Sequence, residues 1–462
     1  MSRVLRLGSY DNLLVAMLFL AVVLTCGLSP MQTDTWWQLR AGQDMWASGS
    51  VLLTDTYSHT AYGAFWPNHE WLAEVVFYGL YTLGGLGLLT LFSAGLIAGG
   101  WAFTWRLTHG PTRRAFIWVA LALVPSAGWW EPRPHAFSLL FIPLTVFLLV
   151  RGRVWWLPAI FLVWANVHGG VLLGLVLLAV GLGAQVVIER ALWRRALMVF
   201  AACVLAMTVT PLGLSFWTVI PQSLSRISQY TFDEWKRPGL TELPMLPFWF
   251  IGAVYIAAAF RHMSSVHRLT PAQATVHASA LVLLPGAITA VRNVGPFLML
   301  TVPALSHLLD MRARGHGPAK EEKPVVNLAI MSLAVAATVL TLATAYREAW
   351  PRLRWHPVPS GALAALKKCP DNLYNRYDEG SFLLWFAQTQ KVFIDGRQDP
   401  FPADLVLEHI QVETGQTGHD EVFARHAIRC AYLPTVSPVA RRLSEEGWKP
   451  LYQDRNWVVL RD

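Results

Sequence analysis

Long apolar runs alternate with short polar connections through the first three quarters of the chain. Runs that approach ~20 residues can cross a bilayer as helices. About eleven such spans can be drawn, and they occupy residues 13–29, 86–107, 116–129, 137–150, 155–167, 171–188, 196–212, 246–260, 274–290, 296–309 and 325–345. The pattern therefore predicts a mostly α-helical, polytopic membrane protein.

Two polar connections are long enough to hold structure of their own. In the first, residues 30–84, apolar residues recur at helical spacing over 35–48 and 70–83. This spacing predicts two amphipathic helices at the membrane interface, the second with Glu70 and Glu74 on its polar side. The second connection, residues 214–244, predicts short helices. We therefore expect a transmembrane domain over 1–345 that includes the loop 30–84.

Residues 346–462 differ from the rest because their apolar runs are short. "KVFIDGR" and "AIRCAYLP" are typical of strands, and "DEGSFLLWFAQ" and "SPVARRLSEEG" are typical of helices that follow a capping residue. Alternation of strands and helices predicts a small soluble α/β domain.

Composition supports a membrane protein. The chain is 54% hydrophobic and 14% charged, whereas soluble domains contain about 25% charged residues. Its 22 tryptophans are expected to anchor span ends at the interface. The net charge of +8 arises entirely from residues 1–345, where a basic excess reflects membrane orientation. The sequence has no nucleic-acid, nucleotide or hydrolase motif, so we expect no nucleic-acid partner.

The loop charges predict how the chain is oriented. Sixteen arginines and lysines lie at one set of span ends and six at the opposite set. The positive-inside rule places the richer set, and the N-terminus, in the cytoplasm. An odd number of spans then puts the terminal domain outside the cytoplasmic membrane. Cys369 and Cys430 share that domain and can pair in an oxidising compartment, but the sequence does not decide whether they do.

Polar residues next to apolar sequence are costly and point to function. On the predicted outer side, five motifs contain such residues: "DTWW", "NHEWL", "WWEPRPH", "WANVHGG" and "VRNVGPF". They supply the candidate site residues Asp34, Trp37, His69, Glu70, Arg133, His135, Asn166, His168 and Arg292. The cytoplasmic side has little except basic residues at span ends. The asymmetry predicts a polar cavity that opens to the outside.

The residue types suggest a chemistry. Arg133 and Arg292 can bind a phosphate, because a guanidinium can bond two oxygens at once. Trp37 offers an aromatic face to a sugar ring or an isoprenoid chain. Asp34 can act as a general base toward an acceptor hydroxyl or amine.

Each of these residues also has a purely structural interpretation. Asp34 can cap the helix that follows it, and Trp36 and Trp37 can anchor the loop at the interface. The arginines can form ion pairs with Glu131 or another acid. His69 and Glu70 can be solvated residues of an interfacial helix.

The same applies to the remaining motifs. Asn166, His168 and similarly His135 can hold helices together. "FIDGRQDPF" can be a strand and turn fixed by an Asp395–Arg397 pair, or a loop that uses both residues and Asp399 to bind the acceptor.

These features together resemble the GT-C superfamily of integral-membrane glycosyltransferases. The resemblance rests on an acid just after the first span, a long first outer loop, many spans and an outer C-terminal domain. The strings "DTWWQLRAGQDMW", "NHEWL" and "FIDGR" are also similar to a group of bacterial membrane proteins with "DxWWHLRxG". Gln38 replaces the histidine of that group, so a histidine is not essential there. Only the role of the loop acid carries over, onto Asp34.

The resemblance implies a transferase of the bacterial cytoplasmic membrane that moves a sugar from a polyprenyl-phosphate donor to an acceptor at the outer face. Membrane lipids are further expected partners, and neither the sugar nor the acceptor is specified. A divalent metal is possible but not favoured, since the adjacent pair His69–Glu70 is weak evidence for a metal site. The alternatives are a transporter or flippase of a lipid-linked or acidic solute, and a non-catalytic scaffold that presents the terminal domain.

Overall fold

The computed structural model describes residues 7–227, 233–263, 269–310, 322–416 and 418–462. It divides into two compact units. We call the first the membrane unit, which comprises Met1–Ser29, Gly84–Gly213 and Tyr230–Leu353. We call the second the loop-tail unit, which comprises Pro30–Leu83, Leu214–Gln229 and Arg354–Asp462. The first outer loop thus groups with the terminal segment, although the sequence assigned them to different domains.

Some predictions lie outside the described residues. They are the central part of the second connection, residues 228–232, and six basic residues of the charge count, Arg3, Arg6, Arg268, Arg312, Arg314 and Lys320. The described part of that connection contains the helix α10 (Phe216–Ile227) and the short helical turn η5 (Asp233–Trp235).

The membrane unit consists of helices, and each predicted apolar run corresponds to one of them. They are α2 (Tyr10–Gly27), the second part of α4 (Trp71–Leu107), α5 (Thr112–Ser126), α6 (His135–Val150), α7 (Leu157–Val167), α8 (Val171–Ile188), α9 (Trp193–Met207), α11 (Leu246–Arg261), α12 (Pro271–Thr289), α13 (Val294–Asp310) and α14 (Pro324–Arg347). Among the described helices, six are long and apolar enough to span a membrane. The predicted polytopic helical fold is confirmed, and the count of eleven spans stays a prediction.

Helix α4 changes direction at two glycines, where the sequence predicted a break between an amphipathic helix and a span. Gly84 and Gly85 have non-helical backbone angles, and Gly85 has φ 62° and ψ −162°. A residue with a Cβ rarely adopts that conformation. The glycine pair therefore ends the first arm of α4, which belongs to the loop-tail unit, and starts the arm of the membrane unit.

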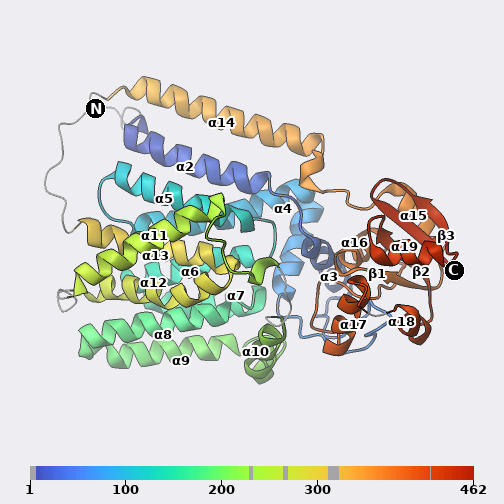
Figure 1. Cartoon of the computed structure of the whole chain (residues 1–462). Helices are drawn as coiled ribbons and strands as arrows, with labels where there is room; N and C mark the ends of the chain where they lie inside the picture. Colours follow the sequence, from blue (N-terminus) through green and yellow to red (C-terminus); the bar gives the residue numbers. More distant parts are fainter. Residues whose placement is uncertain (1–6, 228–232, 264–268, 311–321, 417) are drawn as a thin grey trace. The chain divides into compact units, whose positions relative to one another are not determined.

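Helices α2 and α14 lie side by side and run in the same direction (Figure 1). Asn327 donates a hydrogen bond to the Gly8 carbonyl at 2.8 Å, and the Tyr346 hydroxyl donates one to the Gly27 carbonyl at 3.0 Å. A Cβ on Gly8 would lie 2.3 Å from the Pro324 carbonyl oxygen. Small residues let these two helices approach closely, as is common in membranes.

The loop-tail unit joins the helix α3 (Thr33–Ser48), the first arm of α4 and α10 to the terminal segment. The terminal helices are α15 (Ser360–Leu366), α16 (Tyr377–Phe386), α17 (Ala403–Glu413), α18 (Asp420–Arg425) and α19 (Pro438–Glu445). Trp36 of α3 packs on Phe386 of α16 with 4.7 Å between ring centroids, and Arg40 donates to the Leu384 carbonyl at 3.2 Å. These contacts attach α3 to the terminal segment.

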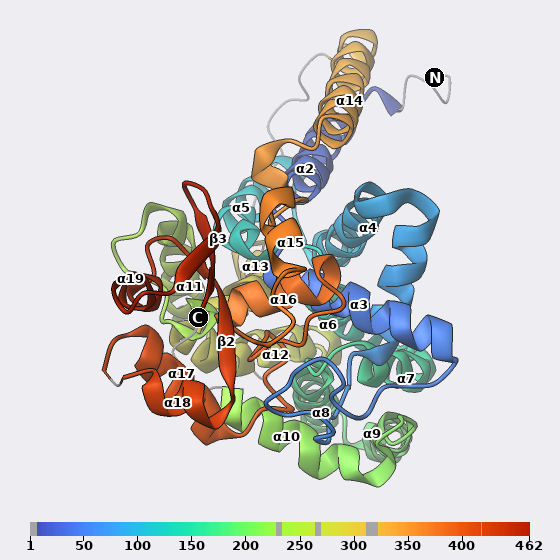
Figure 2. The same ribbon diagram turned by 90° about the vertical axis from the view of Figure 1, so that its right-hand side faces the viewer.

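The terminal segment also contains a mixed four-stranded sheet. Its strands are β1 (Asn372–Asn375), β2 (Ile428–Pro434), β3 (Lys449–Gln453) and β4 (Trp457–Arg461), in the order β1-β2-β4-β3. Strand β2 is parallel to β1 and antiparallel to β4, and Figure 2 shows β2 with α18 beside it. A disulfide joins Cys369 to Cys430 of β2. The predicted α/β composition of the terminal segment is confirmed, including strand β2 and helices α16 and α19.

One predicted strand is wrong. "KVFIDGR" does not join the sheet as a strand. Instead, Val392 forms an isolated parallel bridge with Ser58 of the first loop. The backbone N–H of His59 donates to the Val392 carbonyl at 3.0 Å, and the N–H of Val392 donates to the Tyr57 carbonyl at 3.1 Å. The segment pairs with a partner more than 300 residues away in the chain, which local sequence does not reveal.

Candidate active site

Asp34 lies in the first turn of α3, which begins at Thr33. The residue at the N-cap is Gln32, and its side chain makes no capping hydrogen bond. The interpretation of Asp34 as the cap is therefore wrong by two positions. Its Oδ1 accepts a hydrogen bond from the indole Nε1 of Trp37 at 3.1 Å. An acid in a first turn also interacts favourably with the helix dipole.

Trp36 and Trp37 do not anchor the loop at a membrane interface. Their side chains are 1% and 7% exposed. Trp37 packs edge-on against Trp66 with 6.0 Å between ring centroids. The pair belongs to the core of the loop-tail unit, and Trp37 orients the Asp34 carboxylate by its indole N–H.

The turn of the "FIDGR" motif lies against Asp34. A Cβ placed on Gly396 would lie 2.6 Å from Asp34 Oδ1 and 3.1 Å from Trp37 Nε1. The hydroxyl of Tyr377 donates to the Gly396 carbonyl at 2.9 Å. Burial, followed by the nearby charge of Asp34, raises the pKa of Tyr377 well above its usual value. The first loop and the terminal segment thus meet at the candidate catalytic acid.

Arg397 is the centre of a buried ionic cluster. Its Nε and Nη2 donate to the two oxygens of Asp395 at 2.8 and 2.7 Å, and Nη2 lies 2.7 Å from Asp55 Oδ1. Its guanidinium carbon lies 4.9 and 4.8 Å from the ring centres of Tyr57 and Trp66. Burial opposes the charge, but Asp395 and Asp55 outweigh it and raise the pKa of Arg397.

The structure confirms the ion pair between Asp395 and Arg397 that the structural interpretation of this motif predicted, but not its strand. Neither side chain is exposed, which leaves no accessible charge there for an acceptor. Asp399, the third acid of the motif, accepts a hydrogen bond from Ser223 of α10. The motif connects three segments of the loop-tail unit.

His69 and Glu70 precede the first arm of α4 and are mostly buried. The side chains are 16% and 15% exposed, and His69 Nε2 lies 3.9 Å from Glu70 Oε1. Gln38 donates to Glu70 Oε2 at 3.1 Å. The amide N–H of Gln38 thus helps to fix the Glu70 carboxylate.

The prediction that Glu74 lies on an exposed polar face of this helix is wrong. Its side chain is fully buried, and Asn68 donates to its Oε2 at 2.7 Å. The reason is that the arm packs against α3. A Cβ on Gly42 of α3 would lie 2.2 Å from the Glu74 carbonyl oxygen. The Glu74 side chain is therefore internal to the loop-tail unit.

In the membrane unit, Arg133 and Arg292 converge on one carboxylate. Arg133 lies between η1 (Ala127–Trp129) and α6, and Arg292 lies in the turn η8 (Val291–Asn293) between α12 and α13. Arg292 Nη1 donates to Glu234 Oε1 at 2.8 Å, and Arg133 Nη1 lies 3.6 Å from Glu234 Oε2. Arg133 is also 3.7 Å from Glu131.

These contacts bear out the ion-pair interpretation of both arginines in this structure. The side chains of Arg133, Arg292 and Glu234 remain 23%, 25% and 19% exposed. Burial alone would raise the pKa of Glu234, but the charges of Arg292 and Arg133 outweigh it, and the pKa lies below its usual value. Glu234 therefore stays ionised between the two guanidinium groups.

His135 begins helix α6 beside this cluster. Its Nε2 donates to the Trp129 carbonyl at 2.7 Å. The bond closes the turn that contains Arg133, so His135 helps to fix the conformation of that turn.

Asn166 and His168 make bonds that join helices of the membrane unit. Asn166 donates to the carbonyls of Leu162 and Val209 at 2.8 and 2.9 Å. The Nδ1 of His168 accepts from Gly170 N–H at 3.0 Å and lies 2.7 Å from Ser138 Oγ. These bonds agree with the interpretation of both residues as packing contacts.

The structure brings in residues that the sequence did not single out for their roles. Glu234 bridges the two arginines, and Asp55 completes the Arg397 cluster. Gly396 lies against Asp34, and Tyr377 donates to the Gly396 carbonyl. The only sequence signal for the last group was the density of polar residues around "FIDGR".

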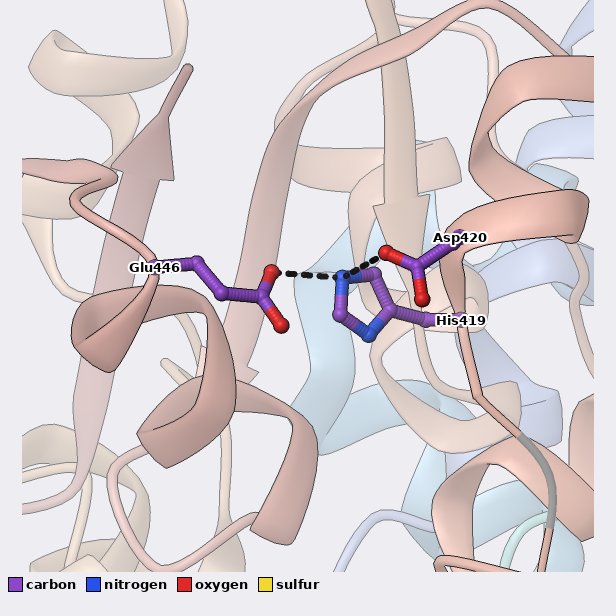
Figure 3. A group of neighbouring side chains, drawn as sticks. All are labelled: His419, Asp420 and Glu446. Atoms are coloured by element: carbon purple, nitrogen blue, oxygen red, sulfur yellow. Dashed lines mark ion pairs between the residues drawn. The ribbon is translucent and has the colours of Figure 1, made fainter.

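One group of described residues could hold a metal ion, namely His419, Asp420 and Glu446 in the terminal segment (Figure 3). His419 Nε2 lies 2.9 Å from Glu446 Oε2 and 3.7 Å from Asp420 Oδ1. A histidine that ligates a metal usually donates its other N–H to an acceptor. The buried Nδ1 of His419 has no such partner among the described residues. We interpret the group as an ion pair that links α18 to α19.

Comparisons with known proteins identify the fold. No protein-family model matches the chain, and no curated protein sequence matches it. The structure of ArnT from Cupriavidus metallidurans in the apo state has a TM-score of 0.51 at 16% identity, covering 96% of this chain and 97% of that one. The chain has the fold of the GT-C glycosyltransferases.

Two further GT-C structures agree. The apo oligosaccharyltransferase of Archaeoglobus fulgidus has a TM-score of 0.51 at 10% identity, covering 91% of this chain and 69% of that one. The oligosaccharyltransferase AglB from the same organism, in complex with an inhibitory peptide and a dolichol-phosphate, has a TM-score of 0.53 at 11% identity with the same coverage. The resemblance drawn from the sequence is confirmed at the level of the GT-C fold.

Proposed function

We propose that this GT-C chain transfers a sugar from a polyprenyl-phosphate donor to an acceptor at the outer face of the cytoplasmic membrane. Its fold is that of membrane transferases, one of which was solved with a dolichol-phosphate. The observation that carries the proposal is the pair Arg133 and Arg292, which meets at one partly exposed anion in the membrane unit.

Arg133 and Arg292 would hold the lipid phosphate. Glu234 contributes one carboxylate to both of them, and a phosphate offers more charge and more acceptor oxygens than a carboxylate. An apolar cavity of about 440 Å³ lies between α2 and α5, and its lining includes Trp130, close in sequence to Arg133. An isoprenoid chain fits such a lining, which supports a lipid donor over a soluble sugar nucleotide.

Asp34 would act as the general base or would orient the acceptor. In the reaction, the bond between the sugar C1 and the phosphate oxygen breaks, and its electron pair leaves with the polyprenyl phosphate. A bond forms between C1 and the acceptor oxygen or nitrogen, whose proton passes to the Asp34 carboxylate. The negative charge that grows on the leaving phosphate is stabilised by the arginines. Trp37 supports this role because its N–H fixes the orientation of the carboxylate.

The remaining candidates would contribute to the sugar and acceptor pocket. They are His69, Glu70, His135, Asn166 and His168, each held by protein contacts in the structure. We place them below Asp34 and the arginine pair, because their bonds also serve packing.

Several observations support an extracytoplasmic terminal domain. The disulfide Cys369–Cys430 suits an oxidising compartment. Helices α2 and α14 run in the same direction, so the first and the last helix of the membrane unit end on the same side. The loop charges favour a cytoplasmic N-terminus.

The experiment is a test for release of the carrier lipid. Membranes from cells that express the chain, and matched membranes without it, receive a series of polyprenyl-phosphoryl pentoses and hexoses, and free polyprenyl phosphate is measured by mass spectrometry. We expect release that depends on the chain with one of these donors. Passage of intact lipid-linked sugar across the membrane without release would support the transporter instead. If no donor is cleaved and none crosses the membrane, the result would support a non-catalytic scaffold.

A further inference from the structure

Gly396 is a glycine because another part of the molecule approaches it. Its backbone is not in the left-handed region in which glycine is favoured. A Cβ at this position would lie 2.6 Å from Asp34 Oδ1, 2.7 Å from Ser381 Oγ and 3.1 Å from Trp37 Nε1. Any side chain here would therefore displace the Asp34 carboxylate or its partner Trp37.

Two side chains of α16 hold the Gly396 backbone in place. The Ser381 hydroxyl oxygen accepts from the Gly396 N–H at 2.9 Å, and the Tyr377 hydroxyl donates to the Gly396 carbonyl at 2.9 Å. The same helix packs on α3 through Phe386 and Trp36. One helix of the terminal segment thus holds both the glycine and the helix that contains Asp34.

The turn itself has little freedom to move. Arg397, the next residue, is fixed by Asp395 and Asp55 in a fully buried cluster. Gln398 has φ 60°, a conformation that residues with a Cβ adopt only where the surroundings enforce it. Because the turn is rigid, a methyl group on Gly396 would move the Asp34 carboxylate more than the turn.

We propose that Gly396, Ser381 and Tyr377 are positioning residues that set the location of the Asp34 carboxylate. This inference rests on the proposed role of Asp34 in the transfer. It gives the terminal domain a part in the reaction without any contact to the substrate. General bases act only within hydrogen-bond reach of the proton they take, and a misplacement of about 1 Å can lower a rate about 100-fold.

The test compares Gly396→Ala with Gly418→Ala in the release assay with purified full-length protein. Gly418 has no positive φ and only an ordinary contact for its Cβ, 3.4 Å to Asp420. We expect Gly396→Ala to lower kcat about 100-fold, in line with a 1 Å displacement, with KM for the lipid donor unchanged. Gly418→Ala should keep the wild-type kcat.

A second pair removes one oxygen atom and guards against misfolding of the first variant. Tyr377→Phe deletes the bond to Gly396, whereas Tyr432→Phe deletes a buried hydroxyl that has no hydrogen-bond partner among the described residues. We expect about a 10-fold fall in kcat for Tyr377→Phe, the loss that one hydrogen bond of about 1.4 kcal/mol corresponds to, and no fall for Tyr432→Phe.

A double variant distinguishes positioning from general damage. If Gly396 acts through Asp34, Asp34→Asn with Gly396→Ala should be no slower than Asp34→Asn alone. Multiplied losses would overturn the inference, and so would wild-type kcat in both Gly396→Ala and Tyr377→Phe. A fully active Asp34→Asn protein would instead refute the proposed role of Asp34, whatever Gly396 does, and absence of release by the wild-type chain would refute the proposed function.

Discussion

Both units contain arginines that face carboxylates, but the two clusters differ in burial and geometry. In the loop-tail unit, Arg397 makes two short bonds to Asp395 and a third to Asp55, and none of these side chains is exposed. In the membrane unit, Arg133 and Arg292 are each about a quarter exposed. The first cluster is closed to ligands, whereas solvent reaches the second.

The bond lengths differ for one of the two exposed arginines. Arg292 Nη1 lies 2.8 Å from Glu234 Oε1, and Arg133 Nη1 lies 3.6 Å from Glu234 Oε2. An arginine whose Nε and Nη2 are paired with carboxylates at short range within the core stabilises the fold. An arginine that is partly exposed to solvent can exchange its carboxylate for a ligand. Burial and geometry therefore separate two motifs that look alike in the sequence.

The largest expected effect is on folding, from Arg397→Met. Removal of the guanidinium leaves Asp395 and Asp55 buried without a counter-ion, which costs about 3–5 kcal/mol. We expect a severe loss of folded protein, measured by thermal unfolding and by yield of monodisperse protein. The matched control is Arg425→Met in the same unit, where the side chain is 56% exposed and pairs with Glu408. Equal stability of the two variants would contradict the comparison.

Arg133→Gln and Arg292→Gln should fold but bind the donor phosphate weakly. A charge-assisted hydrogen bond is worth about 1.5–3 kcal/mol, so affinity for polyprenyl phosphate should fall about 10- to 100-fold for each. The measurement is binding of fluorescent polyprenyl phosphate in detergent, with the matching polyprenol as a phosphate-free probe. Arg237→Gln, an exposed arginine in the same unit, should bind like wild type. Unchanged affinity in both variants would remove these arginines from the donor site.

Glu234→Gln should change the affinity for polyprenyl phosphate in the opposite direction from the two arginine variants. It removes the carboxylate that competes with a phosphate for Arg133 and Arg292. We expect polyprenyl phosphate to bind a few-fold more tightly, on the order of 1 kcal/mol, the usual size of a partly exposed ion pair. Weaker binding in the same assay would show that Glu234 holds the arginines in their binding positions.

The smallest expected effect is the pH dependence of the Glu234 cluster. The pKa of Glu234 is lowered, chiefly because the arginines outweigh the effect of burial. The ionised carboxylate therefore adds stability above its unfolded pKa of about 4.5, and this stability is lost as the pH falls through the lower folded value. The difference in melting temperature between wild type and Glu234→Gln should shrink below pH 4.5. A difference that grows toward low pH would contradict this sign.

The sequence predicted local features well. The break at Gly84 and Gly85 follows from two adjacent glycines between an amphipathic and an apolar pattern. Helix α19 was predicted from Ser437, whose side chain accepts from two backbone N–H groups at its start. Such signals depend on residues within one or two turns of each other, so they can be recognised without knowledge of the fold.

The errors arise where distant segments meet. "KVFIDGR" has the composition of a strand, but its partner is Ser58 of the first loop. The pair Trp36 and Trp37 has the pattern of an interfacial anchor, yet α16 and Trp66 cover it. Glu74 lies on a helical polar face that turned out to be internal. In each case a contact made by residues far apart in the chain decided the environment.

The sequence predicted only part of the candidate site, because contacts between distant residues complete it. Asp34 and the two arginines could be named from residue type and predicted side of the membrane. Glu234 and Gly396 could not be given their roles, because only the fold brings each of them to its partner.

The most direct test of the central claim is the turnover of Asp34→Asn with donor binding measured on the same preparation. The change keeps the size of the side chain and removes its charge. Loss of general-base catalysis should lower the rate of polyprenyl phosphate release about 100- to 10,000-fold, while affinity for polyprenyl phosphate stays within about twofold of wild type, because the proposed phosphate ligands are Arg133 and Arg292. Release at the wild-type rate by Asp34→Asn would contradict the account.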